Sequence, residues 1–326
     1  MNILVTGGAG FIGSNFVRRI FDETLTGINE VVILDKLTYA GVQSNLASVS
    51  EQSRYRFVEG DICDPSLVTQ LVDSVDAVIN FAAESHVDRS ISSAAAFVET
   101  NVAGVQVLLD AVKVTGGKKR FIQVSTDEVY GSIEKGAWDE SCSLLPNSPY
   151  SASKAGGELL ARSYNRTHDL DVVITRCSNN YGPYHFPEKL IPLFITNLIE
   201  GKKVPVYGSG QNVRDWLHVD DHCRGIHTIL MNGNSGAVYN IGGGRELTNL
   251  EITHLILESM GADESSVEYV EDRKGHDLRY SVDWTKINRE LGYEPQVKFE
   301  DGLRETIKWY RDNQTWWEPL KKRAGL

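Results

Sequence analysis

The sequence contains few cysteines, and no two of them are closely spaced. Only four occur in 326 residues, at Cys63, Cys142, Cys177 and Cys223, and none belongs to a C-x-x-C motif. Zinc sites and redox-active dithiols normally need such spacing, and a chain of this length builds a core without disulfides. We therefore expect neither a disulfide framework nor a metal centre.

Positive charge is also scarce. The 33 Lys and Arg residues are outnumbered by 44 Asp and Glu residues, which gives a formal net charge of −11. Because such a chain repels a phosphate backbone, nucleic-acid binding is not expected. No apolar run approaches the length of a membrane span, and the amino terminus lacks the basic segment of a signal peptide. These absences favour a soluble cytoplasmic protein without a membrane partner.

The first half of the chain alternates between two kinds of segment. Apolar, β-branched runs predict buried strands, and the segments between them have helical patterns. Strands that are apolar on both faces and separated by helices are typical of a parallel sheet covered on both sides. The expected fold class is therefore α/β, a Rossmann-like doubly wound parallel sheet. Strands are expected at 3–6, 31–35, 56–59, 77–82, 120–125 and 170–176, and helices at 11–21, 66–72, 94–115 and 149–168.

After about Tyr181 this alternation is lost. Glycine and proline interrupt short segments, as at Gly182-Pro183 and in the run Gly242 to Gly244. We expect residues 1–180 to form a dinucleotide-binding domain that carries the catalytic residues. Residues 181–326 are expected to form mainly a smaller mixed α/β substrate-binding region, from which some segments return to the first domain.

A glycine-rich loop follows the first predicted strand. The segment Gly7 to Gly13 has the spacing of a loop that brings backbone N–H groups to a pyrophosphate at a helix N-terminus. Asp35 ends the next predicted strand, where a carboxylate bonds the adenosine ribose and repels a 2′-phosphate. The cofactor is therefore expected to be NAD, although Lys36 partly offsets this repulsion. Asp61 and Ile62, after the third strand, are placed to meet the adenine.

Tyr150 and Lys154 are four residues apart, which places them on the same face of a helix. Tyrosine is a poor base at neutral pH, but a nearby ammonium group favours the phenolate and makes it a usable base for a sugar hydroxyl. Thr126, at the end of a predicted strand, should lie at the same edge of the sheet. The next two residues, Asp127 and Glu128, can supply one proton donor and one base, because two close carboxyls push one pKa upward.

His218 and His222 have the spacing of two metal ligands on a helix. The glutamate that a metalloprotease motif needs after the first histidine is missing. Asp220 and Asp221 are instead typical of the first turn of a helix, where the macrodipole favours acidic residues. No metal site is predicted here.

Taken together, these motifs resemble the extended short-chain dehydrogenase/reductase superfamily. The glycine loop at 7–13 and Tyr150-x-x-x-Lys154 carry that resemblance. Within the superfamily, the chain is similar to the dTDP-glucose 4,6-dehydratase family, and the match runs from Met1 to Leu320. The segments that carry it are 82–88, 125–131, 177–183, 188–192, 213–216 and 272–277.

This resemblance implies a lyase that uses NAD to remove water from a nucleotide hexose. Oxidation at C4 acidifies the C5 proton, a base removes it, the C6 hydroxyl leaves as water, and the hydride returns to C6. The implied product is dTDP-4-keto-6-deoxyglucose, a precursor of rhamnose and other deoxysugars. The family's roles fall on Tyr150 with Lys154 for oxidation, on Thr126 for bonding the C4 oxygen, on Asp127 as proton donor and on Glu128 as base.

The resemblance also assigns two sets of binding residues by position. Cations among them suit a diphosphate, which an otherwise acidic protein has to attract locally. The cofactor set is Gly7, Gly10, Phe11, Ile12, Gly13, Asp35, Lys36, Thr38, Asp61, Ile62, Ala82, Ala83, Ser85, Asn101, Tyr150, Lys154 and Asn180. The substrate set is Ser85, Thr126, Asn179, Lys189, Leu190, Pro205, Tyr207, Arg214, Asn249, Arg273 and His276.

Other functions on the same fold remain open. A 4-epimerase, or a 4,6-dehydratase acting on another nucleotide hexose such as UDP-glucose, would share the glycine loop and the Tyr-Lys pair. An epimerase has no need for adjacent Asp and Glu after Thr126, because it removes no water. A non-catalytic NAD-sensing protein would be expected to lose Tyr150 or Lys154. The long apolar helix expected at 94–115 is suited to pairing two subunits, so a homodimer is expected.

Overall fold

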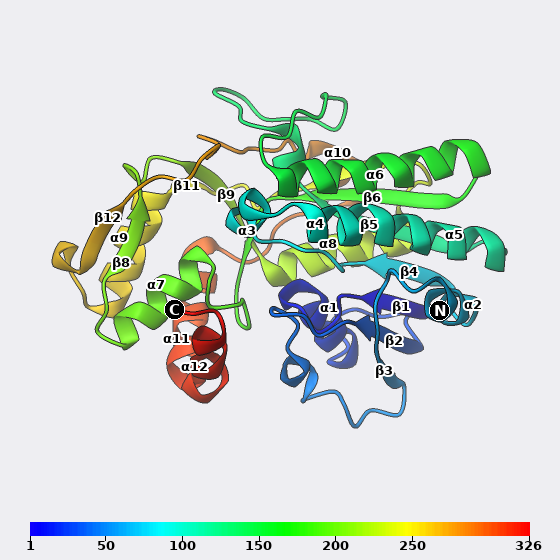
Figure 1. Cartoon of the computed structure of the whole chain (residues 1–326), viewed down its shortest axis with the longest axis horizontal. Helices are drawn as coiled ribbons and strands as arrows, with labels where there is room; N and C mark the ends of the chain where they lie inside the picture. Colours follow the sequence, from blue (N-terminus) through cyan, green and yellow to red (C-terminus); the bar gives the residue numbers. More distant parts are fainter.

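The computed structural model describes residues 1–326, and its main element is a seven-stranded sheet (Figure 1). All neighbouring strands are parallel, and the two strands at the centre, β1 and β4, mark the point where the direction of winding reverses. From edge to edge the strands are β10 (Val238–Ile241), β6 (Asp171–Cys177), β5 (Arg120–Thr126), β4 (Ala77–Asn80), β1 (Asn2–Thr6), β2 (Glu30–Asp35) and β3 (Tyr55–Glu59).

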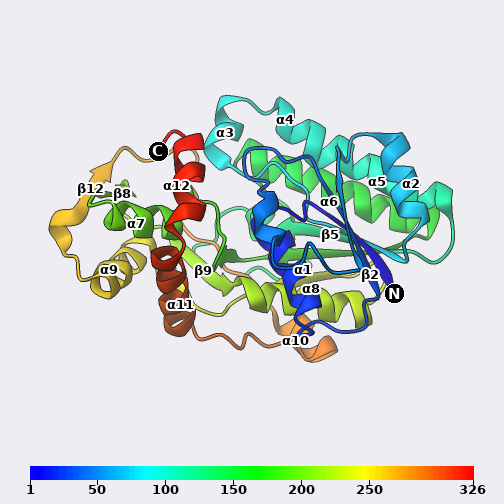
Figure 2. The same cartoon turned by 90° about the horizontal axis from the view of Figure 1, so that it is seen from below.

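Helices cover both faces of this sheet (Figure 2). One face packs against α2 (Pro65–Asp73), α5 (Val105–Thr115) and α6 (Pro149–His168). The other packs against α1 (Phe11–Phe21), α8 (Val219–Asn232) and α10 (Thr285–Leu291). Because both faces are buried, the strands are almost continuously apolar, as the sequence pattern indicated. The predicted Rossmann-like α/β fold is confirmed.

The predicted helix at 94–115 is confirmed as one continuous helical segment, Ala95–Thr115. Within it a π-helical turn, η2 (Glu99–Gly104), lies between α4 (Ala95–Val98) and α5, a local feature that the sequence pattern did not indicate. This turn packs tightly on α6: a Cβ on Gly157 would lie 2.2 Å from the Asn101 carbonyl oxygen. Apolar periodicity does not distinguish a π turn from an α turn, and such turns often occur at functional sites.

The same segment, Ala95–Thr115, is long and apolar enough to cross a membrane by composition, with a mean hydropathy of 1.3. The expectation that no segment approaches this length is therefore corrected. In the fold, 44% of its most apolar window is buried, and α5 packs on α2 and α6. Packing of a helix in the core of a domain accounts for this composition.

A smaller region with its own core lies beside the carboxyl edge of the main sheet, at the left of Figure 1. A three-stranded sheet of β7 (Asn179–Tyr181), β9 (Val213–His218) and β11 (Glu246–Thr248) joins the two parts, and α3 (Val87–Ser92) lies near the junction. The region contains α7 (Leu190–Ile199), β8 (Val204–Tyr207), α9 (Asn249–Met260), β12 (Val267–Val270), α11 (Phe299–Asp312) and α12 (Gln314–Arg323). Since α8, β10 and α10 return to the main sheet, the domain boundary at 180 stays a prediction.

Candidate active site

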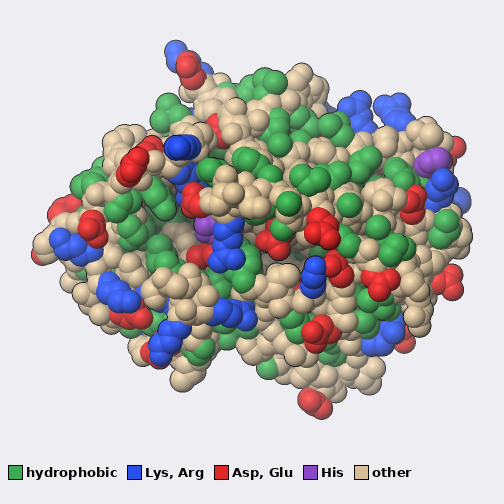
Figure 3. Space-filling view, viewed as in Figure 1, with side chains coloured by type: hydrophobic (Ala, Val, Ile, Leu, Met, Phe, Trp, Pro, Cys, Tyr) green, Lys and Arg blue, Asp and Glu red, His purple; other side chains and the backbone are tan.

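A cavity of about 760 Å³ lies between the carboxyl edge of the main sheet and the smaller region. Figure 3 shows the surface hollowed left of centre, where basic, acidic and histidine side chains meet. Every residue assigned to a site from the sequence lines this cavity, with the exception of Asn101. Parallel strands end at one edge, so residues far apart in the chain converge there.

The glycine loop provides a cradle that a dinucleotide fits. Gly7 has a φ of +66°, and a Cβ there would lie 2.6 Å from the Ala82 nitrogen; a Cβ on Gly13 would lie 2.4 Å from the Gly7 oxygen. Gly10, the N-cap of α1, offers no side chain to the first N–H groups of the helix. These amides face the cavity and are free for an anion such as the pyrophosphate of NAD.

Asp35 is placed where the ribose of the cofactor is expected. Its carboxylate is buried and accepts hydrogen bonds from the backbone N–H groups of Ala9 (2.9 Å) and Leu37 (2.8 Å), which hold it at the end of β2. Burial raises the pKa of Asp35, and these two bonds oppose that shift. Lys36 forms an ion pair with Asp61, so part of its charge is already compensated. Lys36 therefore weakens the repulsion between Asp35 and a 2′-phosphate less than the sequence alone indicated.

The acidic pair lies in a short 3₁₀ turn that directly follows β5. Thr126 begins this turn, Asp127 is 2% exposed, and one Asp127 oxygen lies 3.2 Å from the Thr126 hydroxyl while the other has no partner. Glu128 accepts a hydrogen bond of 3.2 Å from the Ser151 hydroxyl. Both carboxyls line the cavity, so they are not the solvated surface pair that most acidic dipeptides are.

The two carboxyls differ in their electrostatic surroundings. Burial and the neighbouring Glu128 and Asp215 carboxylates raise the pKa of Asp127 well above its usual value. Burial also raises the pKa of Glu128, but the cations Arg214, Lys189 and Arg273 and the bond from Ser151 oppose that shift. This asymmetry suits Asp127 to hold a proton and Glu128 to accept one.

Tyr150 and Lys154 both face the cavity from the start of α6, but the structure shows no hydrogen bond between them. The Lys154 ammonium donates to the Val124 carbonyl at 2.6 Å, and burial lowers its pKa to about 8. Burial and the charge of Glu128 raise the pKa of Tyr150 well above its usual value. Activation of the Tyr150 phenol by Lys154 therefore stays a prediction, and it concerns the site with NAD and the sugar nucleotide bound.

We expect the variant Asp127→Asn to stabilise the protein at neutral pH. The pKa of Asp127 is higher in the folded than in the unfolded chain, so its contribution to stability is present below the unfolded pKa and is lost as pH rises through the folded pKa. An amide does not ionise, so the side chain of the Asp127→Asn variant does not lose this contribution to stability as pH rises. Thermal unfolding should show a Tm gain of about 2 °C or more at neutral pH and a smaller gain near pH 5.

The control for this measurement is Asp301→Asn, which changes an exposed carboxylate on α11 (59% exposed). That variant should show no gain that grows with pH. A Tm difference for Asp127→Asn that is the same at both pH values would contradict the assignment of a raised pKa.

Three cations lie on the substrate side of the cavity. Arg214 donates to the Asp277 carbonyl at 3.0 Å and lies 4.4 Å above the Tyr280 ring, and Arg273 lies 5.0 Å above the Tyr207 ring. Burial lowers the pKa of Lys189, whose ammonium is held by the Ser85 carbonyl at 3.2 Å. In a protein with a net charge of −11, this cluster is a local concentration of positive charge that suits an anionic group such as a diphosphate.

Asn101 does not line the cavity. Its Oδ1 accepts the Glu84 N–H at 3.0 Å. Its Nδ2 donates to the Glu84 carbonyl at 3.0 Å and to the Ser153 hydroxyl at 2.9 Å. It joins the loop after β4 to α6 and so positions the cavity wall. Direct contact between Asn101 and the cofactor stays a prediction.

Several residues at the site were not singled out from the sequence. Ser151 holds Glu128, and its own hydroxyl lies 2.7 Å from Ser148, the N-cap of α6. The only signal was the sequence Ser148-Pro149, which is typical of a helix start and says nothing about a carboxylate elsewhere. Tyr280, which stacks beneath Arg214, gave no signal at all, since its partner lies far away in the sequence.

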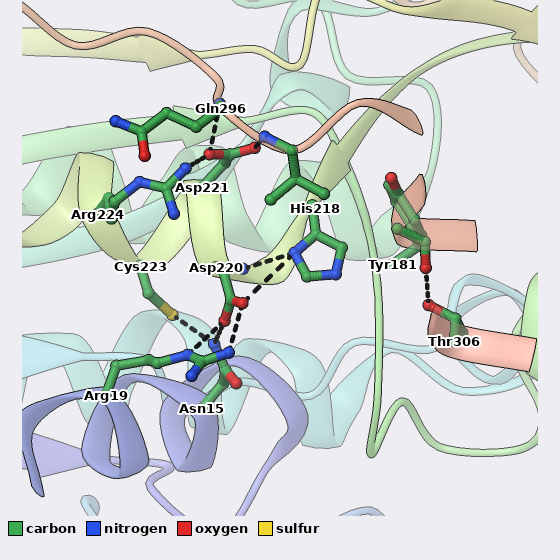
Figure 4. Close-up of polar contacts among 12 residues, drawn as sticks. Asn15, Arg19, Tyr181, His218, Asp220, Asp221, Cys223, Arg224, Gln296 and Thr306 are labelled. Atoms are coloured by element: carbon green, nitrogen blue, oxygen red, sulfur yellow. Dashed lines mark hydrogen bonds and ion pairs between the residues drawn. The ribbon is translucent and has the colours of Figure 1, made fainter. Parts of the chain in front are cut away.

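The two histidines of the 218–222 segment serve structural roles. His218 accepts the Asp220 N–H at 3.3 Å and caps α8, as expected for a helix start. Figure 4 shows Asp220 directed at Asn15 and Arg19 of α1, which donate to it at 2.8 Å. The His222 ring lies 2.9 Å from the Asn180 amide oxygen. No cluster of three or more His, Cys, Asp or Glu residues suited to a metal occurs in the structure.

Comparison with known proteins places this arrangement among nucleotide-sugar enzymes. The family model of GDP-mannose 4,6 dehydratase matches residues 4–306. A dTDP-glucose 4,6-dehydratase of Streptomyces niveus is 60% identical, with 98% of this chain and 96% of the relative covered. One from Escherichia coli is 47% identical, with 99% and 96% covered.

Solved structures agree with these relatives. DesIV, the dTDP-glucose 4,6-dehydratase of Streptomyces venezuelae with NAD and dTDP bound, has a TM-score of 0.97 and 60% identity, covering 98% of this chain and all of that one. The UDP-glucose 4-epimerase of Thermotoga maritima has a TM-score of 0.88 and 32% identity, covering 96% and 100%. The chain therefore belongs to the GDP-mannose 4,6-dehydratase family of the extended short-chain dehydrogenases/reductases.

Proposed function

We propose that this protein is an NAD-dependent hydro-lyase that converts dTDP-glucose to dTDP-4-keto-6-deoxyglucose. The observation that carries the proposal is the adjacent pair of buried Asp127 and half-buried Glu128, both of which line the cavity with Tyr150. Burial and neighbouring carboxylates favour the protonated form of Asp127. Nearby cations favour the ionised form of Glu128, which can accept a proton. Close relatives are named for this activity, which supports the choice of nucleotide.

The reaction needs three steps, and the chain supplies a group for each. Tyr150 accepts the C4 hydroxyl proton, while Thr126 bonds the C4 oxygen and Lys154 supplies positive charge. Bound NAD takes the C4 hydride and later returns it to C6. Glu128 removes the C5 proton made acidic by the new ketone, and Asp127 protonates the C6 oxygen, which leaves as water. A proton returned to C5 completes the product.

The same assignment extends to binding. We propose that the cradle at 7–13, Asp35, the Lys36–Asp61 pair and the loop after β4 hold the cofactor. The diphosphate of the substrate is assigned to Lys189, Arg214 and Arg273. Asn101 is assigned a positioning role through Glu84 and Ser153.

A 4-epimerase is the strongest rival, because solved epimerases share this fold at about 30% identity. Epimerisation moves a hydride at C4 only and has no use for a proton donor near C6. Holding a buried carboxyl, Asp127, next to a second, half-buried one, Glu128, costs free energy, and a fold does not normally sustain such a pair without a function for it. The Asp127–Glu128 pair therefore favours water loss.

The activity can be tested with three sugar nucleotides. A 4-keto-6-deoxy sugar develops an enolate absorbance band in alkali, whereas an epimerised sugar does not. We expect the band with dTDP-glucose, and a kcat/KM at least about tenfold lower with UDP-glucose and GDP-mannose. Absence of the band with all three substrates would overturn the proposal.

We also infer a homodimer formed through α4, α5 and α6. Hydrophobic side chains gather over these helices in Figure 3, and Val98, Val114 and Leu159 are 49–68% exposed there. Analytical ultracentrifugation should give twice the chain mass of 36.2 kDa.

We further infer a cytoplasmic location, which the four unpaired cysteines support.

A further inference from the structure

Six residues between β7 and α7, Tyr184–Lys189, run along the cavity beside α1, and all but Pro187 line it; we call this segment the strap. The His185 ring stacks on Phe11, the first residue of α1, with 4.2 Å between ring centroids and 13° between planes. The Arg18 guanidinium of the same helix lies 4.0 Å from the centroid of the Tyr184 ring. The strap therefore lies over the helix whose N-terminus is open to the pyrophosphate.

Glu188 joins the strap to the two loops that flank the cofactor cradle. Its side chain is 6% exposed. It accepts the Tyr39 hydroxyl at 3.0 Å, from the loop after β2. It also lies 3.6 Å from His86 and 3.5 Å from Arg89, in the segment after β4. One carboxylate thus connects three segments that surround the same space.

Tyr39 is held in place from several sides. Its ring meets Phe186 edge-on, with centroids 5.5 Å apart, and the Arg89 guanidinium lies 3.6 Å from its centroid. Arg323, near the end of α12, donates to its carbonyl oxygen. The hydrogen bond between Tyr39 and Glu188 is therefore part of a group of contacts that joins the strap, the loop after β2, α3 and α12, and is not an isolated surface bond.

Both segments that meet at this contact contain strained backbone. Leu37 has a φ of +52° and Tyr184 a φ of +68°, in the left-handed region that side chains other than glycine rarely adopt. Such conformations persist only where the surroundings hold them, and they occur preferentially at ligand clamps and switches. Opening the contact would allow both segments to relax.

We propose that Tyr39 and Glu188 form a latch that closes the strap over the bound dinucleotide and retains it through successive turnovers. The proposal rests on the proposed function, because an enzyme that regenerates its cofactor within each cycle works without releasing it. Tyr39 and Glu188 are positioning residues that contact each other and not the reacting atoms. The cofactor leaves only when their contact opens, so this opening limits the rate of NAD exchange.

The test measures exchange of bound NAD for isotopically labelled NAD in the intact protein, without any sugar nucleotide. Tyr39→Phe removes the hydroxyl and keeps the ring contacts, and Glu188→Ala removes the acceptor. Each should speed exchange about tenfold, the factor equivalent to about 1.4 kcal/mol. The double variant should be no faster than the faster single variant, because both changes break one contact.

Two further variants separate a latch from a general loss of structure. Glu188→Gln keeps an acceptor for the Tyr39 hydroxyl and should restore most of the retention. Tyr239→Phe removes a tyrosine–carboxylate bond to Glu290 (3.1 Å) away from the cavity and should exchange NAD at the parent rate.

Exchange at the parent rate in both Tyr39→Phe and Glu188→Ala, or effects that multiply in the double variant, would overturn the latch. Since the measurement uses no substrate, it is independent of the dehydration assay, and either proposal can fail alone.

Discussion

Replacing Glu128 by Gln should leave oxidation at C4 intact and remove the C5 proton transfer. Gln has nearly the same shape and can still accept the Ser151 hydroxyl, so the turn after β5 should be preserved. An amide is not a base, and general-base catalysis by one group is worth about 10²–10⁴-fold. With dTDP-glucose, reduction of the bound cofactor should persist, while wash-in of solvent deuterium at C5 and overall turnover fall by about that factor.

The matched control is Glu140→Gln. Glu140 is also a carboxyl whose pKa is raised by burial, but it accepts the Asn240 N–H at 2.9 Å and does not line the cavity. The Glu140→Gln variant should exchange the C5 proton with solvent deuterium, and should turn over, at close to the parent rate. Parent-rate C5 exchange in Glu128→Gln would show that another residue is the base, and the assignment of Glu128 would be wrong.

Replacing Tyr150 by Phe should stop the reaction before the cofactor is reduced. The ring stays in place against Phe97, with centroids 6.4 Å apart, but the proton acceptor for the C4 hydroxyl is lost. We expect the rate of cofactor reduction in a single turnover to fall by about 10²–10⁴-fold. Absorbance of the reduced cofactor after mixing with dTDP-glucose measures this step directly.

A bypass experiment distinguishes loss of this step from damage to the whole site. If dTDP-4-ketoglucose is supplied already oxidised, the step that uses Tyr150 is complete, and Glu128 should exchange the C5 proton in the Tyr150→Phe variant nearly as in the parent. Loss of C5 exchange with this compound would mean that the substitution disturbs the elimination site as well. Cofactor reduction at the parent rate would exclude Tyr150 as the base.

Local sequence was sufficient for six of the seven strands of the main sheet and for much of the site. The strands carry their own apolar runs, and α1 and α6 begin and end where the pattern predicted, since Pro149 and the glycine loop define their starts within a few residues. The resemblance placed the cradle and the catalytic residues, and nearly all of them line one cavity. Such features depend on neighbours in the chain, which the sequence displays directly.

Only the tertiary structure decided how these groups are tuned and held. The pKa difference between Asp127 and Glu128 arises from burial and from cations on distant segments, and Lys154 turns to Val124 rather than to Tyr150. Asn101, in the π-helical turn, forms hydrogen bonds with the backbone of Glu84 and with the Ser153 hydroxyl. Contacts between residues more than a hundred positions apart, such as Tyr39 with Glu188, leave no local pattern, because they exist only after the sheet has brought the loop ends to one edge.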